Sequence, residues 1–163
     1  SENLIKTSEQ LSLIIKDAKK NYKNHKKNPA TKTFQAIRIL VNQELSELIL
    51  GLIAAAELLK NGGILVVVSF HSLEDKIVKY FFNIYSNLKK NPSRYLPINK
   101  NKPGLFSIIS KKPLTPSKEE ILTNSRARSA KLRHGTRNSN TFYDDQELQK
   151  KFENYLGMEA IRL

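Results

Sequence analysis

Residues 69–72, Ser-Phe-His-Ser, have side chains that could carry out chemistry. They directly follow the apolar run 64–68, which contains three consecutive valines. In open α/β sheets, ligands gather beyond the carboxyl ends of such strands, which places Ser69 and His71 at the mouth of a site. His71 can accept or donate a proton near neutral pH, although a single histidine at such a turn can equally be a structural hydrogen-bond partner.

The residues around His71 favour no other reaction centre. We interpret Ser72 as the N-cap of a following helix, because no Gly-x-Ser-x-Gly turn surrounds it. Glu74 and Asp75 are adjacent and point in different directions from a helix, so they do not form a carboxylate pair. The absence of cysteine excludes thiolate chemistry, and three scattered histidines do not have metal-ligand spacing. We expect no metal site.

The charge balance indicates a polyanionic partner. The chain has 163 residues, the length of one ordinary domain, and a formal net charge of +13. Such an excess of cations suits nucleic acid better than a small-molecule substrate. No apolar run approaches the length that spans a bilayer, and no signal-peptide pattern begins the sequence. We therefore expect a cytoplasmic protein, or an organellar homologue of one, with no membrane partner.

Helical patterns precede and follow the central strand. The capping-box pattern Thr7-x-x-Gln10 predicts a first helix of about four turns. Apolar spacing predicts one long helix over residues 31–59 and another over residues 72–88. Because the strand between them is continuously apolar, we expect it to be buried on both faces in a parallel or mixed sheet.

The second half of the sequence contains two predicted strands and a basic segment. We expect strands at residues 105–110 and 124–135, with a short helix from Ser117 to about Thr123 between them. The later strand would hold several cations in exposed positions: Arg126, Arg128, and Lys131 or Arg133. The basic run 19–28 is either a solvated loop or a phosphate-contacting edge. A loosely attached tail would end in one amphipathic helix, closed by Gly157.

Three sequence segments carry a family resemblance when they are taken together. They are residues 28–39 (NPATKTFQAIRI), 69–75 (SFHSLED) and 125–133 (SRARSAKLR), and residues 111–117 (KKPLTPS) support them. Their order and distances closely resemble the C-terminal half of the MraW family of S-adenosylmethionine-dependent 16S rRNA cytosine-N4 methyltransferases. The resemblance covers about residues 4–134, and the tail from Asn138 matches no pattern of that family.

The resemblance implies an α/β fold of the class I, Rossmann-like methyltransferase type. Residues 1–30 would be the end of a helical insertion, residues 31–138 the C-terminal half of the methyltransferase domain, and residues 139–163 the tail. The family's glycine-rich cofactor turn and its ribose-binding acid are absent, because Gly62-Gly63 precedes a strand instead of following one. We therefore expect most of the S-adenosylmethionine site outside this chain, and no activity from the chain alone.

The resemblance also suggests roles for individual residues. Ser69 and His71 would line one wall of a pocket that receives a cytosine of 16S rRNA in the small ribosomal subunit. The cations would hold RNA phosphates or, alternatively, form a solvated surface; they are Arg38, Arg126, Arg128, Lys131 and Arg133. A different function remains open, that of a non-catalytic basic α/β module that only binds RNA.

Overall fold

The computed structural model describes residues 4–19, 28–86, 103–144 and 146–160. The chain divides into two compact units, Ser1–Glu44 and Leu45–Leu163, and each is described here by itself. The basic residues Lys20, Lys23, Lys26 and Lys27 lie outside the described residues. So does most of the polar connection predicted between the helix that follows the central strand and the next strand.

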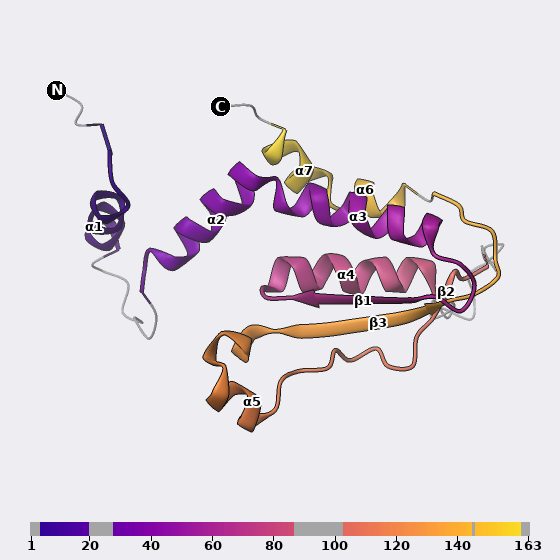
Figure 1. Cartoon of the computed structure of the whole chain (residues 1–163). Coiled ribbons are helices and arrows are strands. Elements are labelled where there is room, and N and C mark those ends of the chain that lie inside the picture. The colour runs from indigo at the N-terminus through magenta and orange to yellow at the C-terminus, as the bar shows by residue number, and fades with distance from the viewer. Residues whose placement is uncertain (1–3, 20–27, 87–102, 145, 161–163) are drawn as a thin grey trace, which may run out of the picture. The chain divides into compact units, whose positions relative to one another are not determined.

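The first unit contains helices α1 (Ser8–Ala18) and α2 (Thr31–Asn42) (Figure 1). The predicted capping box of α1 is confirmed. The Thr7 hydroxyl accepts the Gln10 N–H at 3.2 Å, and the Gln10 side chain accepts the Thr7 N–H at 3.2 Å. Helix α1 is shorter than predicted within the described residues, because Lys19 already leaves helical geometry as its C-cap.

The single long helix predicted for residues 31–59 is wrong. It is divided into α2 and α3 (Glu44–Leu58) by Gln43, whose backbone is left-handed with φ 52° and ψ 38°. A continuous helix would place Arg38 and Glu44 on different faces, whereas here their side chains form an ion pair at 2.7 Å. No single described helix has the length and apolarity to cross a membrane; α2 and α3 meet that test only as a bent pair.

The sheet has three strands in the order β1-β3-β2: β1 (Ile64–Ser69), β2 (Phe106–Ser107) and β3 (Lys131–Arg137). Strand β3 lies between the other two and pairs with both in antiparallel fashion. The prediction of a parallel or mixed sheet is therefore wrong for these named strands. β2 is also much shorter than the predicted strand 105–110, because its pairing with β3 covers only two residues.

Only one face of β1 is covered, contrary to the prediction that both are. Exposure alternates along the strand, and Ile64, Val66 and Val68 are 62%, 53% and 48% exposed. The opposite face of the sheet packs on α4 (Ser72–Tyr85). Gly135 of β3, which pairs with Leu65 of β1, shows this by its contact with Phe82 of α4. A Cβ at Gly135 would meet the Phe82 ring at 2.7 Å, so this glycine permits the close approach of strand and helix.

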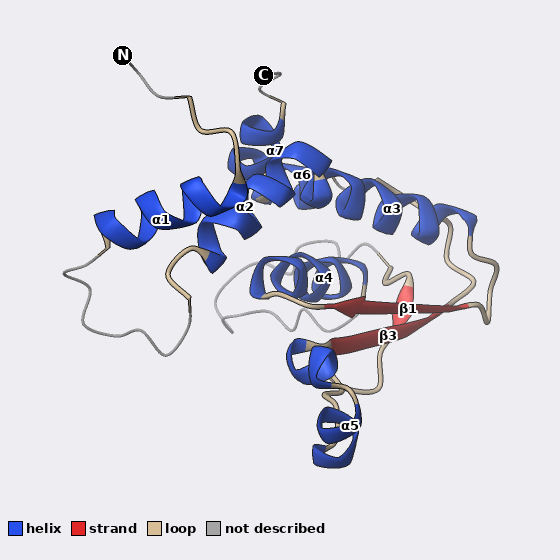
Figure 2. Cartoon of the chain, turned by 60° about the vertical axis from the view of Figure 1, so that its left-hand side comes forward, coloured by secondary structure: helices blue, strands red, loops and turns tan. Residues whose placement is uncertain are grey.

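Helix α4 is the centre of the second unit. Figures 1 and 2 show it lying along the sheet, with α3 and the C-terminal helices on its other side. Covered on both sides, it buries apolar side chains around most of its circumference. The fully buried ones are Ile77, Val78, Phe81 and Tyr85. The predicted helix and most of its predicted buried face are thus confirmed, up to Tyr85.

The predicted strand 124–135 is wrong in its first half. Residues Ser125–Ser129 form a 3-10 helix, η1, and β3 begins only at Lys131. The Asn124 side chain accepts the Arg126 N–H at 3.2 Å, a local bond that favours a turn over a strand. Helix α5 (Lys118–Thr123) precedes η1, and its predicted start is confirmed because Ser117 accepts the Glu120 N–H at 3.1 Å.

The C-terminal tail is packed rather than loosely attached. It forms two helices, α6 (Glu147–Lys151) and α7 (Glu153–Glu159), instead of the one predicted, and α7 continues through Gly157. Leu148 and Phe152 are 1% and 2% exposed. The Phe152 ring meets the Tyr80 ring of α4 edge-on at 5.7 Å between centroids. Apolar burial thus holds the tail to α4.

Candidate functional site

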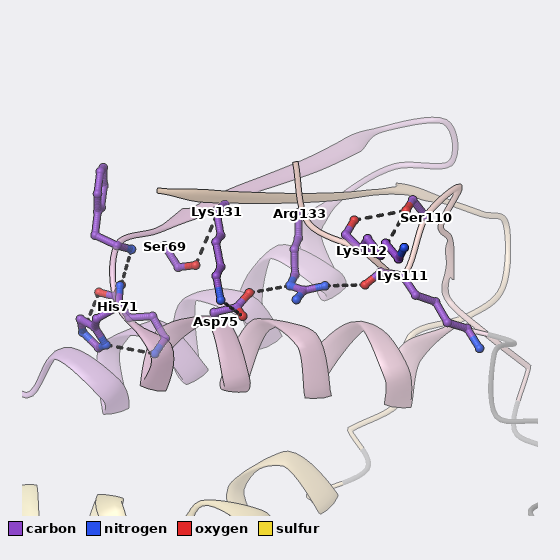
Figure 3. A network of polar contacts seen from close by, with 10 residues as sticks. Ser69, His71, Asp75, Ser110, Lys111, Lys112, Lys131 and Arg133 are labelled. Atoms are coloured by element: carbon purple, nitrogen blue, oxygen red, sulfur yellow. Dashed lines mark hydrogen bonds and ion pairs between the residues drawn. The ribbon is translucent and has the colours of Figure 1, made fainter. Parts of the chain in front are cut away.

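Two of the sequence segments singled out above meet at the carboxylate of Asp75. Asp75, near the start of α4, is 9% exposed. Its Oδ1 accepts Arg133 Nε at 2.8 Å, and its Oδ2 accepts Lys131 Nζ at 2.9 Å (Figure 3). Both cations come from β3, so one carboxylate clamps the strand to the helix. Lys131 and Arg133 therefore face α4. The prediction of an exposed position is wrong for Arg133, whose side chain is 10% exposed, whereas the Lys131 side chain remains 39% exposed.

The two cations also determine the protonation of Asp75. Burial by itself raises the pKa of this carboxyl group, because it disfavours the charged form. The hydrogen bonds and charges of Arg133 and Lys131 outweigh burial, and together they hold the pKa of Asp75 below its usual value. The carboxylate is therefore ionised at neutral pH, and the junction carries two cations and one anion.

His71, rather than Ser72, is the N-cap of α4, which corrects the predicted cap. The His71 ring nitrogen Nδ1 accepts the Glu74 N–H at 3.3 Å. In return, the Glu74 carboxylate accepts the His71 N–H at 3.2 Å and the Phe70 N–H at 2.8 Å. Histidine can cap in this way only through an unprotonated nitrogen, so Nδ1 carries no proton.

The other ring nitrogen of His71 is enclosed but makes no hydrogen bond to a described residue. This atom, Nε2, lies 3.2 Å from Glu74 Oε1, without hydrogen-bond geometry. Because Nδ1 is the acceptor, Nε2 carries the proton of the neutral ring. His71 therefore has one donor that the capping box does not use.

Ser69 takes part in the sheet. It is 3% exposed, and its hydroxyl donates to the Lys131 carbonyl oxygen at 3.3 Å. Ser69 and Lys131 are also partners in the strand register. The structure thus brings Ser69, Asp75, Lys131 and Arg133 together at one end of the β1–β3 pair, and His71 lies two residues beyond Ser69.

The remaining candidate cations lie elsewhere. Arg126 and Arg128 are exposed on η1, and their positions leave both guanidinium groups open to solvent. Arg38 belongs to the other unit, where its side chain is 56% exposed and paired with Glu44. Among the described residues of the second unit, the Asp75 carboxylate thus bonds to Lys131 and Arg133 and not to Arg126 or Arg128.

A comparison with protein-family models matches residues 1–138 to the MraW methylase family. The chain belongs to the MraW methylase family. Curated proteins that it resembles include several named "Ribosomal RNA small subunit methyltransferase H". The protein from Ehrlichia ruminantium (strain Gardel) is 48% identical over 134 residues, which are 82% of this chain and 42% of that protein. The one from Methylocella silvestris is 55% identical over 113 residues, 69% of this chain and 33% of that protein.

The chain spans about two fifths of the length of the curated relatives that it matches first, as 42% of the Ehrlichia ruminantium protein and 40% of the Ehrlichia chaffeensis protein show. The MraW match ends at Asn138, so α6 and α7 lie beyond it. The tail that covers α4 is therefore outside the part that the family model describes.

The described residues of this MraW chain do not fit the cofactor of a methyltransferase. Gly62, with φ 83°, forms a turn before β1, and its N–H is bonded to the Arg137 carbonyl oxygen at 2.8 Å. At the opposite end of β1, where a ligand would bind, the Phe70 and His71 amides are taken by Glu74. The chain's own Glu74 carboxylate thus occupies two of the amides just before the first turn of α4.

Sequence reasoning missed two charged residues of this MraW chain. Asp75 was set aside because it is adjacent to Glu74, although it is the residue that joins the two segments. Arg137 is 5% exposed, and it donates from Nε to the Ala56 carbonyl oxygen at 3.0 Å and from Nη1 to that of Asn138 at 2.7 Å. The period-two pattern of Lys131, Arg133 and Arg137 could have placed all three on one face.

Proposed function

We propose that this chain is part of an enzyme that transfers a methyl group from S-adenosylmethionine to the exocyclic N4 amine of a cytosine in 16S rRNA. The observation that carries the proposal is the match of residues 1–138 to the MraW methylase family, whose curated members here are named as small-subunit rRNA methyltransferases. Because the chain covers less than half of those relatives, the activity belongs to the longer protein.

The chemistry requires precise orientation of the base. The lone pair of the cytosine amine is delocalised into the ring, which makes the amine a poor nucleophile. The methyl group must therefore be presented in line, and the base must be held by hydrogen bonds to its edge. We propose that His71 lines the wall of the base pocket as the N-cap that fixes the start of α4, while its enclosed Nε2 stays beside the Glu74 carboxylate. Ser69 holds the neighbouring backbone through its bond to Lys131.

The cofactor's residues are proposed to lie in the part of the relatives that this chain does not cover. S-adenosylmethionine supplies the methyl group when it is bound. The described residues offer it no glycine turn after a strand, and Glu74 already accepts the Phe70 and His71 amides that precede the first turn of α4. The contribution of this chain is the wall of the base pocket and contacts with the RNA.

A non-catalytic RNA-binding module is the second candidate. The net charge of +13 and the exposed arginines of η1 favour RNA binding by themselves, without any cofactor. The genomic reading frame separates the two functions. A preceding open frame that encodes a glycine-rich cofactor turn supports the enzyme, and an initiator codon immediately before Ser1 supports the module.

The decisive assay uses the complete protein encoded by that reading frame. It is incubated with isotopically labelled S-adenosylmethionine and small ribosomal subunits that lack the modification, and the rRNA nucleosides are then identified by mass spectrometry. We expect labelled N4-methylcytidine. Label on carbon 5 of cytosine, on the ribose or on another base would contradict the proposed position, and absence of label would contradict the enzyme.

A further inference from the structure

A basic notch lies between α4, β3 and the segment that follows β2. We call it the α4–β3 notch. All of its residues belong to the second unit. Its polar lining consists of Lys79, Asn83, Ser110, Lys111, Arg133 and His134. No carboxylate lines it among the residues that the structure describes, so the notch is positively charged as well as concave.

Arg133 is held rigidly at the base of this notch. Its side chain is 10% exposed, Nε donates to Asp75, and Nη1 donates to the Lys111 carbonyl oxygen at 2.8 Å (Figure 3). The remaining nitrogen, Nη2, makes no hydrogen bond to a described residue and is not enclosed. The guanidinium group therefore keeps the N–H groups of Nη2, fixed in position, for a ligand.

Two lysines complete the notch. Lys79 of α4 and Lys111 are exposed, and neither forms an ion pair in the described part of the chain. Among the residues that the structure describes, Asp75 is the carboxylate that bonds to this cluster, and both of its oxygens are already bonded to Arg133 and Lys131. The local charge therefore remains positive after Asp75 is counted.

We propose that the α4–β3 notch binds a phosphate group of an RNA backbone. A tetrahedral anion accepts hydrogen bonds from several directions, which suits the fixed Nη2 of Arg133 flanked by two mobile ammonium groups. The proposal rests on the proposed function only in naming RNA as the source of the phosphate. It assigns a role in RNA binding to Lys79 and Lys111, and it gives Arg133 both a structural bond to Asp75 and a bond to RNA.

The test measures the affinity of this chain for a short, fluorescently labelled single-stranded RNA over a series of potassium chloride concentrations. The variant Lys79→Gln/Lys111→Gln removes two notch cations and leaves Arg133 in place. The control variant Lys60→Gln/Lys150→Gln removes the same charge from exposed positions outside the notch. Melting curves of all three proteins check folding, which such exposed substitutions should leave almost unchanged.

We expect the notch variant to bind RNA more weakly. Its plot of log affinity against log salt should be flatter by about 1.4, or about 0.7 for each lost contact with single-stranded RNA. The control variant should keep a slope close to that of the parent. Equal slopes for the two variants would contradict phosphate binding at the α4–β3 notch, even if the complete enzyme methylates rRNA. A parent chain that binds no RNA would overturn both the notch and its proposed partner.

Discussion

The neighbouring carboxylates of Glu74 and Asp75 have different partners and different structural roles. Glu74 turns back along α4 and accepts the amides of Phe70 and His71, whereas Asp75 reaches across to β3. Successive helix residues point about 100° apart, which is why adjacency in the sequence separates their functions. One carboxylate starts the helix and the other attaches it to the sheet.

The Asp75 clamp makes stability depend on pH in the acid range. The pKa of Asp75 is lower in the folded chain than in the unfolded chain, so ionised Asp75 stabilises the fold above the unfolded pKa of about 3.9. This contribution is lost as pH falls through the folded pKa. We expect Asp75→Asn to lower the free energy of unfolding by about 2 kcal/mol at neutral pH. Urea titrations of both proteins measure the difference, which should shrink below about pH 4; a difference that is constant to pH 2 would contradict the clamp.

Substitutions of His71 separate its role as the N-cap of α4 from its proposed role in the cytosine pocket. His71→Ala should destabilise the chain by about 1 kcal/mol, while His71→Asn, which also caps helices, should retain most of the stability. Chemical denaturation of this chain measures both effects. In the complete enzyme we expect His71→Asn to raise KM for rRNA because the imidazole that would line the base pocket is lost. Parental kinetics in that variant would limit His71 to capping.

At the scale of elements, the break between α2 and α3 has a simple test. In a continuous helix, glycine at position 43 would cost about 1 kcal/mol relative to alanine. With φ at 52°, Gln43→Gly should instead stabilise the chain by about 0.5 kcal/mol, because the side chain is strained in the left-handed region. Gly51→Ala in α3 is a control with the reverse exchange at a position inside a helix. Open space surrounds Gly51, so alanine should stabilise the chain there by about 1 kcal/mol. Thermal melting compares all three proteins.

Patterns of local origin were predictable from the sequence, and pairings between distant segments were not. The caps at Thr7 and Ser117 depend on residues three positions apart, and both are confirmed. The apolar stripe of α4 is likewise local. By contrast, the apolar run of β1 suggested burial on both faces of a parallel or mixed sheet, whereas exposure alternates along it and its partner β3 is antiparallel and lies 62 to 72 residues later in the register. The Asp75 clamp escaped prediction for the same reason, since its partners are 56 and 58 residues away.

At the scale of the whole second unit, Glu159 links the C-terminal tail to the beginning of α3. Glu159 is 4% exposed, and its carboxylate accepts the Leu45 N–H at 3.0 Å and the Ser46 N–H at 2.9 Å, together with the Ser46 hydroxyl. A negative charge at these amides also complements the dipole of α3. The tail therefore supplies a cap for the first turn of α3.

Removal of this charge should weaken the fold. We expect Glu159→Gln to lower the free energy of unfolding by about 1 to 2 kcal/mol, because one oxygen acceptor and the charge are lost. The matched control is Glu153→Gln at the exposed start of α7, which should change it by less than about 0.5 kcal/mol. Guanidinium titrations followed by circular dichroism measure both. Equal losses in the two variants would show that the Glu159 contacts contribute no stability of their own.

The long sequence separation between Glu159 and the α3 amides that it accepts also has a consequence during biosynthesis. Leu45 and Glu159 are separated by 114 positions, and a ribosome adds roughly 5 to 20 residues per second. The first turn of α3 therefore emerges roughly 6 to 23 s before the carboxylate that caps it. During that interval its amides are open to solvent or to a chaperone, and the second unit can reach its final form only after α7 has left the exit tunnel.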